Sequence, residues 1–182
     1  MKIQTEQIIN ELSELTQHHL SYARSLQSSS PELLNFKPSA EQWSTLECLE
    51  HLNRYGLFYL PEIERSIKNA VKTDSSSYKS GWLGNYFANS MLPKERLNKM
   101  KTFKNMNPSG SDLGTEVITE FIRQQEQLLR LLENARNTHL GKIRTSISIS
   151  KLIRLKLGDT FRFYTYHIVR HIEQVKRTLP SS

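Results

Sequence analysis

The chain of 182 residues, with 37% hydrophobic and 24% charged residues, fits a single domain spanning residues 1–182 and excludes disordered and fibrous proteins. Its formal net charge of +7 raises the question of a nucleic-acid partner. The densest basic region, residues 142–156, spreads five basic residues among aliphatic ones and contains no Gly-rich or zinc-finger motif. We therefore do not expect nucleic acid as a partner.

Two further features bear on location. No apolar run approaches the roughly 20 residues that a membrane helix needs, and the polar start of the chain does not fit a signal peptide. The only cysteine, Cys48, cannot form an internal disulfide, which is compatible with a reducing compartment. We expect a cytoplasmic protein without a membrane partner.

Hydrophobic periodicity predicts the first two helices. A helix over residues 3–27 carries an apolar seam formed by Ile8, Leu12, Leu15, His19, Tyr22 and Leu26. A second helix is predicted from residue 44 to about residue 71, because Ser44 and Glu47 have the spacing of a capping box. Pro61 is expected to kink this helix.

The turn-rich sequence from residue 72 to residue 114 predicts a long crossover. Long loops usually contain some structure of their own. We expect the apolar segment within this crossover to form a short helix, anchored over the other helices by Trp82, Phe87 and Leu92.

Two more helices are predicted, over residues 115–138 and 159–178. Residues 143–157 between them are ambiguous, since their first half alternates like a strand and their second half fits a helical turn. The predicted fold is therefore all-α, a four-helix bundle with a long crossover between its second and third helices.

Three histidines carry the candidate chemistry. His167 and His171 are four residues apart and share one face of the last helix. On the second helix, His51 belongs to a stripe with Cys48 and Tyr55, on the side away from the leucines. If the two helices are neighbours, three neutral imidazoles converge and leave coordination positions open. Such pairs also arise by chance, so structural histidines remain an alternative.

Two segments, FKPSAEQWSTLECLEHL at 36–52 and HIVRHIEQ at 167–174, resemble the DinB-like (DinB/YfiT-like) family. The resemblance implies a divalent metal held by His51, His167 and His171. It also implies a metal-dependent enzyme, either a thiol transferase acting on a low-molecular-weight thiol or a hydrolase acting on another small molecule. A homodimer is expected on the same ground.

Zinc, nickel and iron all accept imidazole, so the sequence does not choose the ion.

Other residues near these histidines are weaker candidates for the site. Gln174 is considered as a residue that orients a ligand or substrate, with a polar residue at the edge of the bundle as the commoner role. His19 is considered as an additional ligand, with a place in the seam of the first helix as the commoner role. Cys48 is interpreted as a small buried hydrophobe. Arg54 and Arg170 are considered as attractors of an anionic substrate at the cleft mouth.

Two classes of function remain in view. The first is the metal-dependent enzyme, with substrate held between the second and fourth helices; the sequence does not identify its catalytic residues. The second is a noncatalytic, stress-associated binding or dimerisation module in which the histidines are structural. Loss of metal on substitution of the histidines distinguishes the first class from the second.

Overall fold

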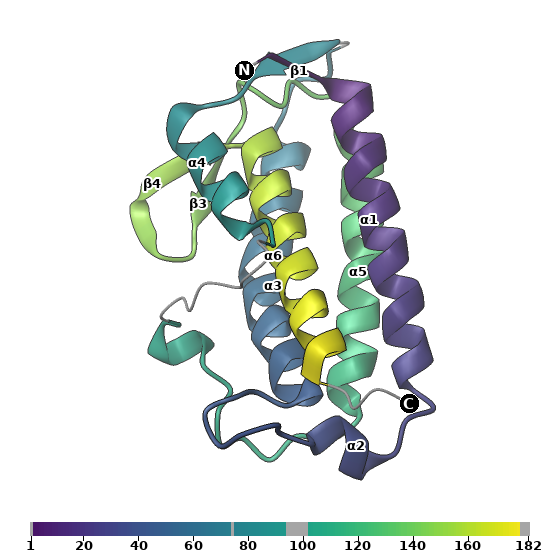
Figure 1. The fold of residues 1–182 in the computed structure, drawn as a ribbon. Coiled ribbons are helices and arrows are strands. Elements are labelled where there is room, and N and C mark those ends of the chain that lie inside the picture. Colours follow the sequence, from purple (N-terminus) through teal and green to yellow (C-terminus); the bar gives the residue numbers. More distant parts are fainter. Residues whose placement is uncertain (1, 74, 94–101, 179–182) are drawn as a thin grey trace.

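The computed structural model describes residues 2–73, 75–93 and 102–178, and this part of the chain is mostly helical. Four long helices lie side by side, with α3 and α5 running in one direction and α1 and α6 in the other (Figure 1). They are α1 (Thr5–Leu26), α3 (Thr45–Lys68), α5 (Glu116–Ala135) and α6 (Leu157–Thr178). The four predicted helices are confirmed, each end lying within three residues of its expected position.

The strand β1 (Lys2–Gln4) precedes α1. The described parts of the connections contain α2 (Pro31–Asn35), β2 (Ser77–Lys79), α4 (Trp82–Met91), the 3-10 helix η1 (Lys104–Met106), β3 (Arg144–Ile147) and β4 (Ser150–Lys156). β1 pairs antiparallel with β2, and β3 pairs antiparallel with β4. The expectation of an all-α fold therefore omitted two small sheets.

The predicted capping box at the start of α3 is confirmed. Ser44 Oγ accepts from the Glu47 backbone N–H at 3.2 Å, and the Glu47 carboxylate accepts from the Ser44 N–H at 3.0 Å. Glu47 also pairs with Lys37 at 2.7 Å and accepts from the Gly110 N–H at 3.3 Å. One buried carboxylate thus holds the helix start and two loops together. Pro61 lies inside α3, which continues to Lys68.

The short helix predicted within the crossover is α4, but two of its expected anchors are wrong. Trp82 is 84% exposed and Leu92 is 38% exposed. Instead, Gly84, Ala88 and Met91 are buried, and α4 packs on α6 through this small-residue face. The sequence pattern revealed an apolar helix but not which face meets the protein. Residues 94–101 of the crossover lie outside the described residues.

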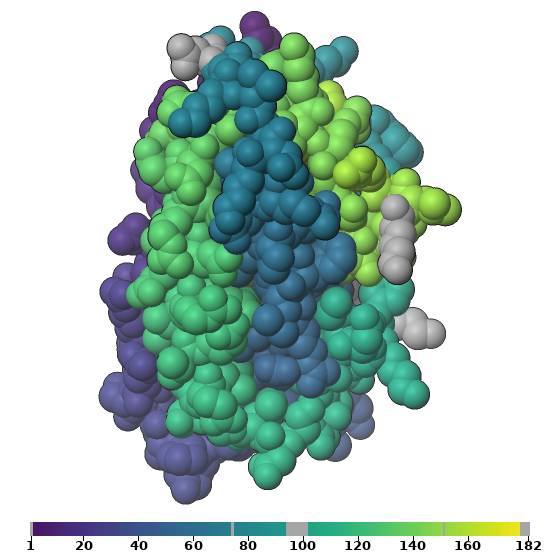
Figure 2. Space-filling model, turned by 180° about the vertical axis from the view of Figure 1, so that it is seen from behind, coloured from purple at the N-terminus to yellow at the C-terminus, as the bar shows by residue number. Residues whose placement is uncertain are grey.

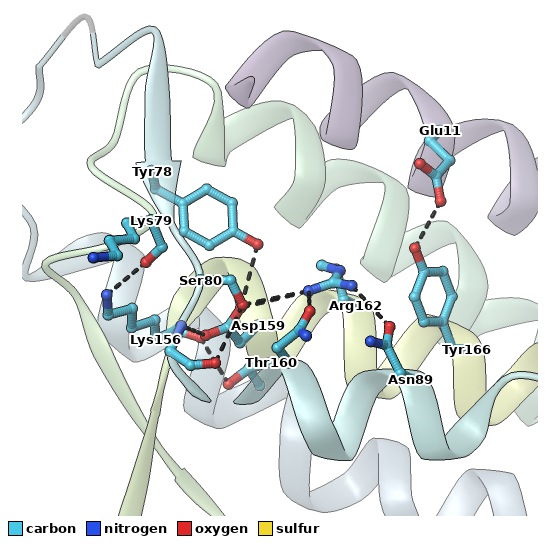
Figure 3. Close-up of polar contacts among 12 residues, drawn as sticks. Glu11, Tyr78, Lys79, Ser80, Asn89, Lys156, Asp159, Thr160, Arg162 and Tyr166 are labelled. Atoms are coloured by element: carbon cyan, nitrogen blue, oxygen red, sulfur yellow. Dashed lines mark hydrogen bonds and ion pairs between the residues drawn. The ribbon is translucent and has the colours of Figure 1, made fainter. Parts of the chain in front are cut away.

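A buried polar network fixes α4 to the first turns of α6 (Figure 3). Asp159 accepts from Ser80 Oγ at 2.5 Å and from the Gly81 backbone N–H at 2.8 Å. Arg162, one turn along α6, lies 3.8 Å from the Asp159 carboxylate and donates to Asn89 Oδ1 at 3.1 Å. The bonds to Ser80, Gly81 and Asn89 join residues more than seventy positions apart in the chain, so they position α4 against α6, whereas the Asp159–Arg162 pair lies within α6.

The ambiguous residues 143–157 form the β3–β4 hairpin, after which α6 begins at Leu157. The hairpin projects from the side of the four long helices, as seen from the back of the molecule in Figure 2. Its inner face buries Thr145, Ile147 and Leu155, whereas Leu152 is 94% exposed. Strand alternation thus places one face of the hairpin on α3 and α6 and the other in solvent.

The apolar core lies between the four long helices, and its largest fully buried side chains include Tyr59, Phe121, Tyr164 and Phe161. α3 and α5 approach closely at Gly56, where an added Cβ would meet the buried Gln124 side chain at 1.7 Å. Among the described residues, no helix is long and apolar enough to cross a membrane.

Candidate metal centre

Three buried histidines from two neighbouring helices meet at one point. His51 lies in the second turn of α3, and His167 and His171 lie one turn apart on α6. Each offers one ring nitrogen to a group of atoms that all lie within 4.8 Å of one another. His51 Nε2 and His167 Nε2 are 3.2 Å apart. The predicted convergence of these three residues is therefore what the structure shows.

Hydrogen bonds outside the cluster orient two of the three rings. His51 Nδ1 lies 2.7 Å from the Met106 carbonyl oxygen, which can only accept, so Nδ1 carries the proton and Nε2 keeps its lone pair. His171 Nδ1 lies 3.0 Å from Gln174 Oε1, so in this ring too Nδ1 carries the proton and Nε2 keeps its lone pair. His167 Nδ1 is buried without a hydrogen-bond partner among the described residues.

The cluster is neutral at physiological pH. Burial and, to a smaller extent, the charge of Arg54 lower the pKa of His51 to about 4, against the opposing effect of the hydrogen bond to Met106. Burial also holds the pKa values of His167 and His171 well below the usual range, with the neighbouring imidazoles adding to the effect. Neutral imidazole is the form that binds metals.

The donor set suits a divalent ion. Two nitrogens bound to one tetrahedral ion at about 2.05 Å would lie about 3.3 Å apart, and the His51–His167 separation is 3.2 Å. Three imidazoles from rigid helices leave at least one coordination position for water or substrate. Trp43 and Tyr55 pack against the rings, with Trp43 centred 4.8 Å from His51 and Tyr55 centred 4.6 Å from His167.

The structure places the other candidate residues differently. Cys48 is fully buried outside the cluster, and burial raises the pKa of its thiol, so it remains a neutral thiol. His19 is buried in α1 and does not belong to the group of three. Arg54 pairs with Glu50 and donates to the Asn107 carbonyl, and it is not among the described residues of the cavity wall. Arg170 does line the cavity.

The contact between His51 and Met106 is one that sequence reasoning missed. Met106 lies in η1, more than fifty residues from His51 in the chain, and it contributes a backbone carbonyl. Every residue type has that group, so no residue pattern could have revealed it. The Gln174 contact, by contrast, agrees with the orienting role considered for that residue.

A cavity of about 910 Å³ opens beside the three histidines. Its wall includes residues of α3, α4, the β3–β4 hairpin and α6, together with the loops that contain Trp43 and Ser109. These loops are joined by a hydrogen bond from Trp43 Nε1 to Ser109 Oγ at 2.9 Å. The volume is within the range of small-molecule sites, about 300–1,000 Å³.

Comparison with known proteins assigns the family. The profile of the DinB superfamily matches residues 6–175, which include all three histidines and all four long helices up to the last turn of α6. No curated protein and no solved structure gives a significant match to the chain. Since the profile covers nearly the whole sequence, the chain belongs to the DinB superfamily.

Proposed function

We propose that this protein is a divalent-metal-dependent enzyme that acts on a small molecule in the cavity, with His51, His167 and His171 as the metal ligands. The convergence of three buried, neutral imidazoles beside a cavity supports this proposal. Zinc, nickel and iron suit such ligands. Thiol transfer and hydrolysis are the two reaction classes that we retain from the family resemblance.

The side chains around the cluster have separate tasks in this proposal. A bound divalent ion supplies Lewis acidity, which lowers the pKa of a coordinated water or thiol. The Met106 carbonyl and Gln174 hold the rings of His51 and His171 in the tautomer that binds. Burial raises the pKa of Tyr55 to about 12. Its hydroxyl therefore stays protonated and can donate a hydrogen bond to a substrate oxygen.

Metal content tests the proposal directly. Tag-free protein, purified without chelator, is expected to carry about one divalent ion per chain by inductively coupled plasma mass spectrometry. His167→Ala should lose this ion, while His18→Ala, at an exposed histidine of α1, should retain it. No metal in the wild type, even after incubation with zinc, nickel, manganese and ferrous iron, would overturn the proposal.

The alternative is a noncatalytic binding or dimerisation module with structural histidines. The direct contact between His51 Nε2 and His167 Nε2 favours it, because the two rings can share one proton without any metal. In that case chelation should leave the melting temperature unchanged. A metal-dependent melting temperature, lost in His167→Ala, would favour the enzyme.

The proposal also covers the helix bundle, the domain organisation, the oligomeric state and the location of the protein. We assign α1, α3, α5 and α6 as the four helices of the expected bundle and residues 1–182 as one domain, because the buried residues of these helices form one core cluster. The homodimer and the cytoplasmic location stay predictions.

A further inference from the structure

The cavity beside the histidines changes character along α6. Phe163, His167, His171 and Gln174 follow one another on the cavity side of this helix. At 1.5 Å per residue, Phe163 and Gln174 are about 16 Å apart along the helix axis. The three histidines therefore lie between two ends of the cavity rather than at its closed bottom.

The end at Phe163 is apolar. Phe163 packs against Phe87 of α4 with ring centroids 6.4 Å apart, and against Tyr59 of α3 at 5.7 Å. The hairpin adds Ile149 to this wall, and α4 adds Tyr86. The other described wall residues that α4 and the hairpin contribute are Ser90, Met91, Ile147 and Leu155. No described residue of this end is charged.

The end at Gln174 is polar. The charged residues of the cavity wall, apart from the histidines and within the described part of the chain, are Glu41, Arg170 and Arg177. They come from the loop before α3 and from the C-terminal half of α6. Gln42, Asn107, Ser109 and Thr178 belong to the same end. The charged side chains of the wall are therefore concentrated on this side of the histidines, where Trp43 also stacks on His171 with ring centroids 5.9 Å apart. Phe103, beside η1, is a further apolar residue of the wall outside α4 and the hairpin.

Two residues of the apolar end are notable for their exposure. Ile149 is 45% exposed and Tyr86 is 62% exposed, although both line the cavity. α4 and the hairpin lie together on one side of the four long helices (Figure 1). Their apolar side chains are available to a ligand, because the protein core does not use them fully.

We infer that the substrate is amphipathic: an aliphatic or aryl group lies against α4 and the hairpin, the reacting group lies at the histidines, and a hydrogen-bonding end lies beside Gln174. This inference rests on the proposed function, because it takes the histidines as the reacting centre. Tyr86, Phe87 and Ile149 are then the residues that select the apolar group.

A homologous series of straight-chain hydroxamates, from acetohydroxamate to octanohydroxamate, tests the inference in zinc-loaded protein. The hydroxamate group binds the metal, and the alkyl chain extends from it. Isothermal titration should show the Kd decreasing about fourfold for each added methylene that the apolar wall buries. An unchanged Kd along the series would overturn the inference.

Two matched pairs of variants locate the effect. Ile149→Ser and Tyr86→Ser should reduce the gain per methylene to less than about twofold. Leu152→Ser and Trp82→Ser change apolar residues of the same hairpin and the same helix that are more exposed, at 94% and 84%, and do not line the cavity, so they should keep the wild-type gain. Equal losses in both members of a pair would contradict the assignment of the wall.

The design separates this inference from the proposed function. The affinity of acetohydroxamate reports the metal, and the change in affinity with chain length reports the apolar wall. If acetohydroxamate does not bind, the proposed function fails. A series of primary alcohols from butanol to octanol, measured on metal-free protein, then tests the wall alone: tightening along this series supports it, and constant affinity overturns it.

Discussion

At the scale of single residues, the partners of the histidines matter as much as the histidines. Gln174 Oε1 accepts from His171 Nδ1 at 3.0 Å, so it fixes the ring angle and raises the basicity of the opposite nitrogen. Gln174→Leu removes this acceptor at nearly constant volume. The affinity for zinc should fall by about 10–100-fold, measured by competition with a chelator of known affinity.

Two further variants distinguish orientation from structure in this prediction. Gln174→Glu retains an acceptor oxygen and should keep most of the affinity. Glu173→Gln, at the preceding position, alters a surface ion pair with Lys176 and should leave the affinity unchanged. Equal zinc affinities for wild type and Gln174→Leu would show that the contact does not support the site.

The three histidines could be predicted as a group because the spacing of residues in a helix determines which side chains share a face. Four residues separate His167 from His171, and any α-helix stacks such side chains on one face. That α3 and α6 would be neighbours was a hypothesis, supported by the family resemblance. Neutral rings were part of the prediction, but their physical cause could not be predicted, because burial depends on the packing of all four long helices.

At the scale of elements, α4 depends on the buried network around Asp159. Asp159 and Arg162 are 1% and 5% exposed in their side chains, so their ion pair lies in a region of low dielectric. Asp159→Asn removes the negative charge and leaves Arg162 without its carboxylate. We expect a loss of about 3 kcal/mol in the free energy of unfolding, measured by urea denaturation.

This loss should be local to the junction of α4 and α6. Amide exchange should rise in α4, while the zinc content stays at the wild-type value, since His167 and His171 lie at least two turns further along α6. Asp112→Asn, at an exposed position, should change the stability by less than about 0.5 kcal/mol. Wild-type stability in Asp159→Asn would mean that the network does not hold α4.

The structure of the hairpin could not be predicted from the sequence. Residues 143–157 carry both a strand pattern and a helical pattern, and contacts distant in the chain decide between them. Thr145 Oγ1 lies 2.5 Å from Thr160 Oγ1, and the Ser146 N–H donates to Glu62 of α3 at 2.8 Å. Local propensity does not contain these contacts. The long helices were predictable because their 3.6-residue periodicity is local and strong.

At the scale of the whole molecule, the four long helices provide a rigid frame and the connections complete the cavity. α3 and α6 bring the histidines together, whereas η1, α4 and the hairpin supply the outer hydrogen bond to His51 and the apolar wall. A change in these connections can therefore alter substrate selection while the histidine cluster stays intact.

The stability of the whole metal-free protein should decrease in mild acid. Burial, with smaller effects from His18 and Lys176, lowers the pKa of His19 to about 3, and burial lowers that of His51 to about 4. Between these values and the unfolded value of about 6.5, the unfolded chain binds protons that the folded chain does not. The free energy of unfolding therefore falls as the pH falls through this window.

Each such histidine contributes about 2 kcal/mol to this loss at pH 5, since one pH unit corresponds to about 1.4 kcal/mol. Urea denaturation of metal-free protein at pH 7 and pH 5 measures the total. His19→Leu removes one group away from the cluster, so it should reduce the loss by about 2 kcal/mol. If His19→Leu shows the full wild-type loss, His19 is not neutral in the folded protein at pH 5.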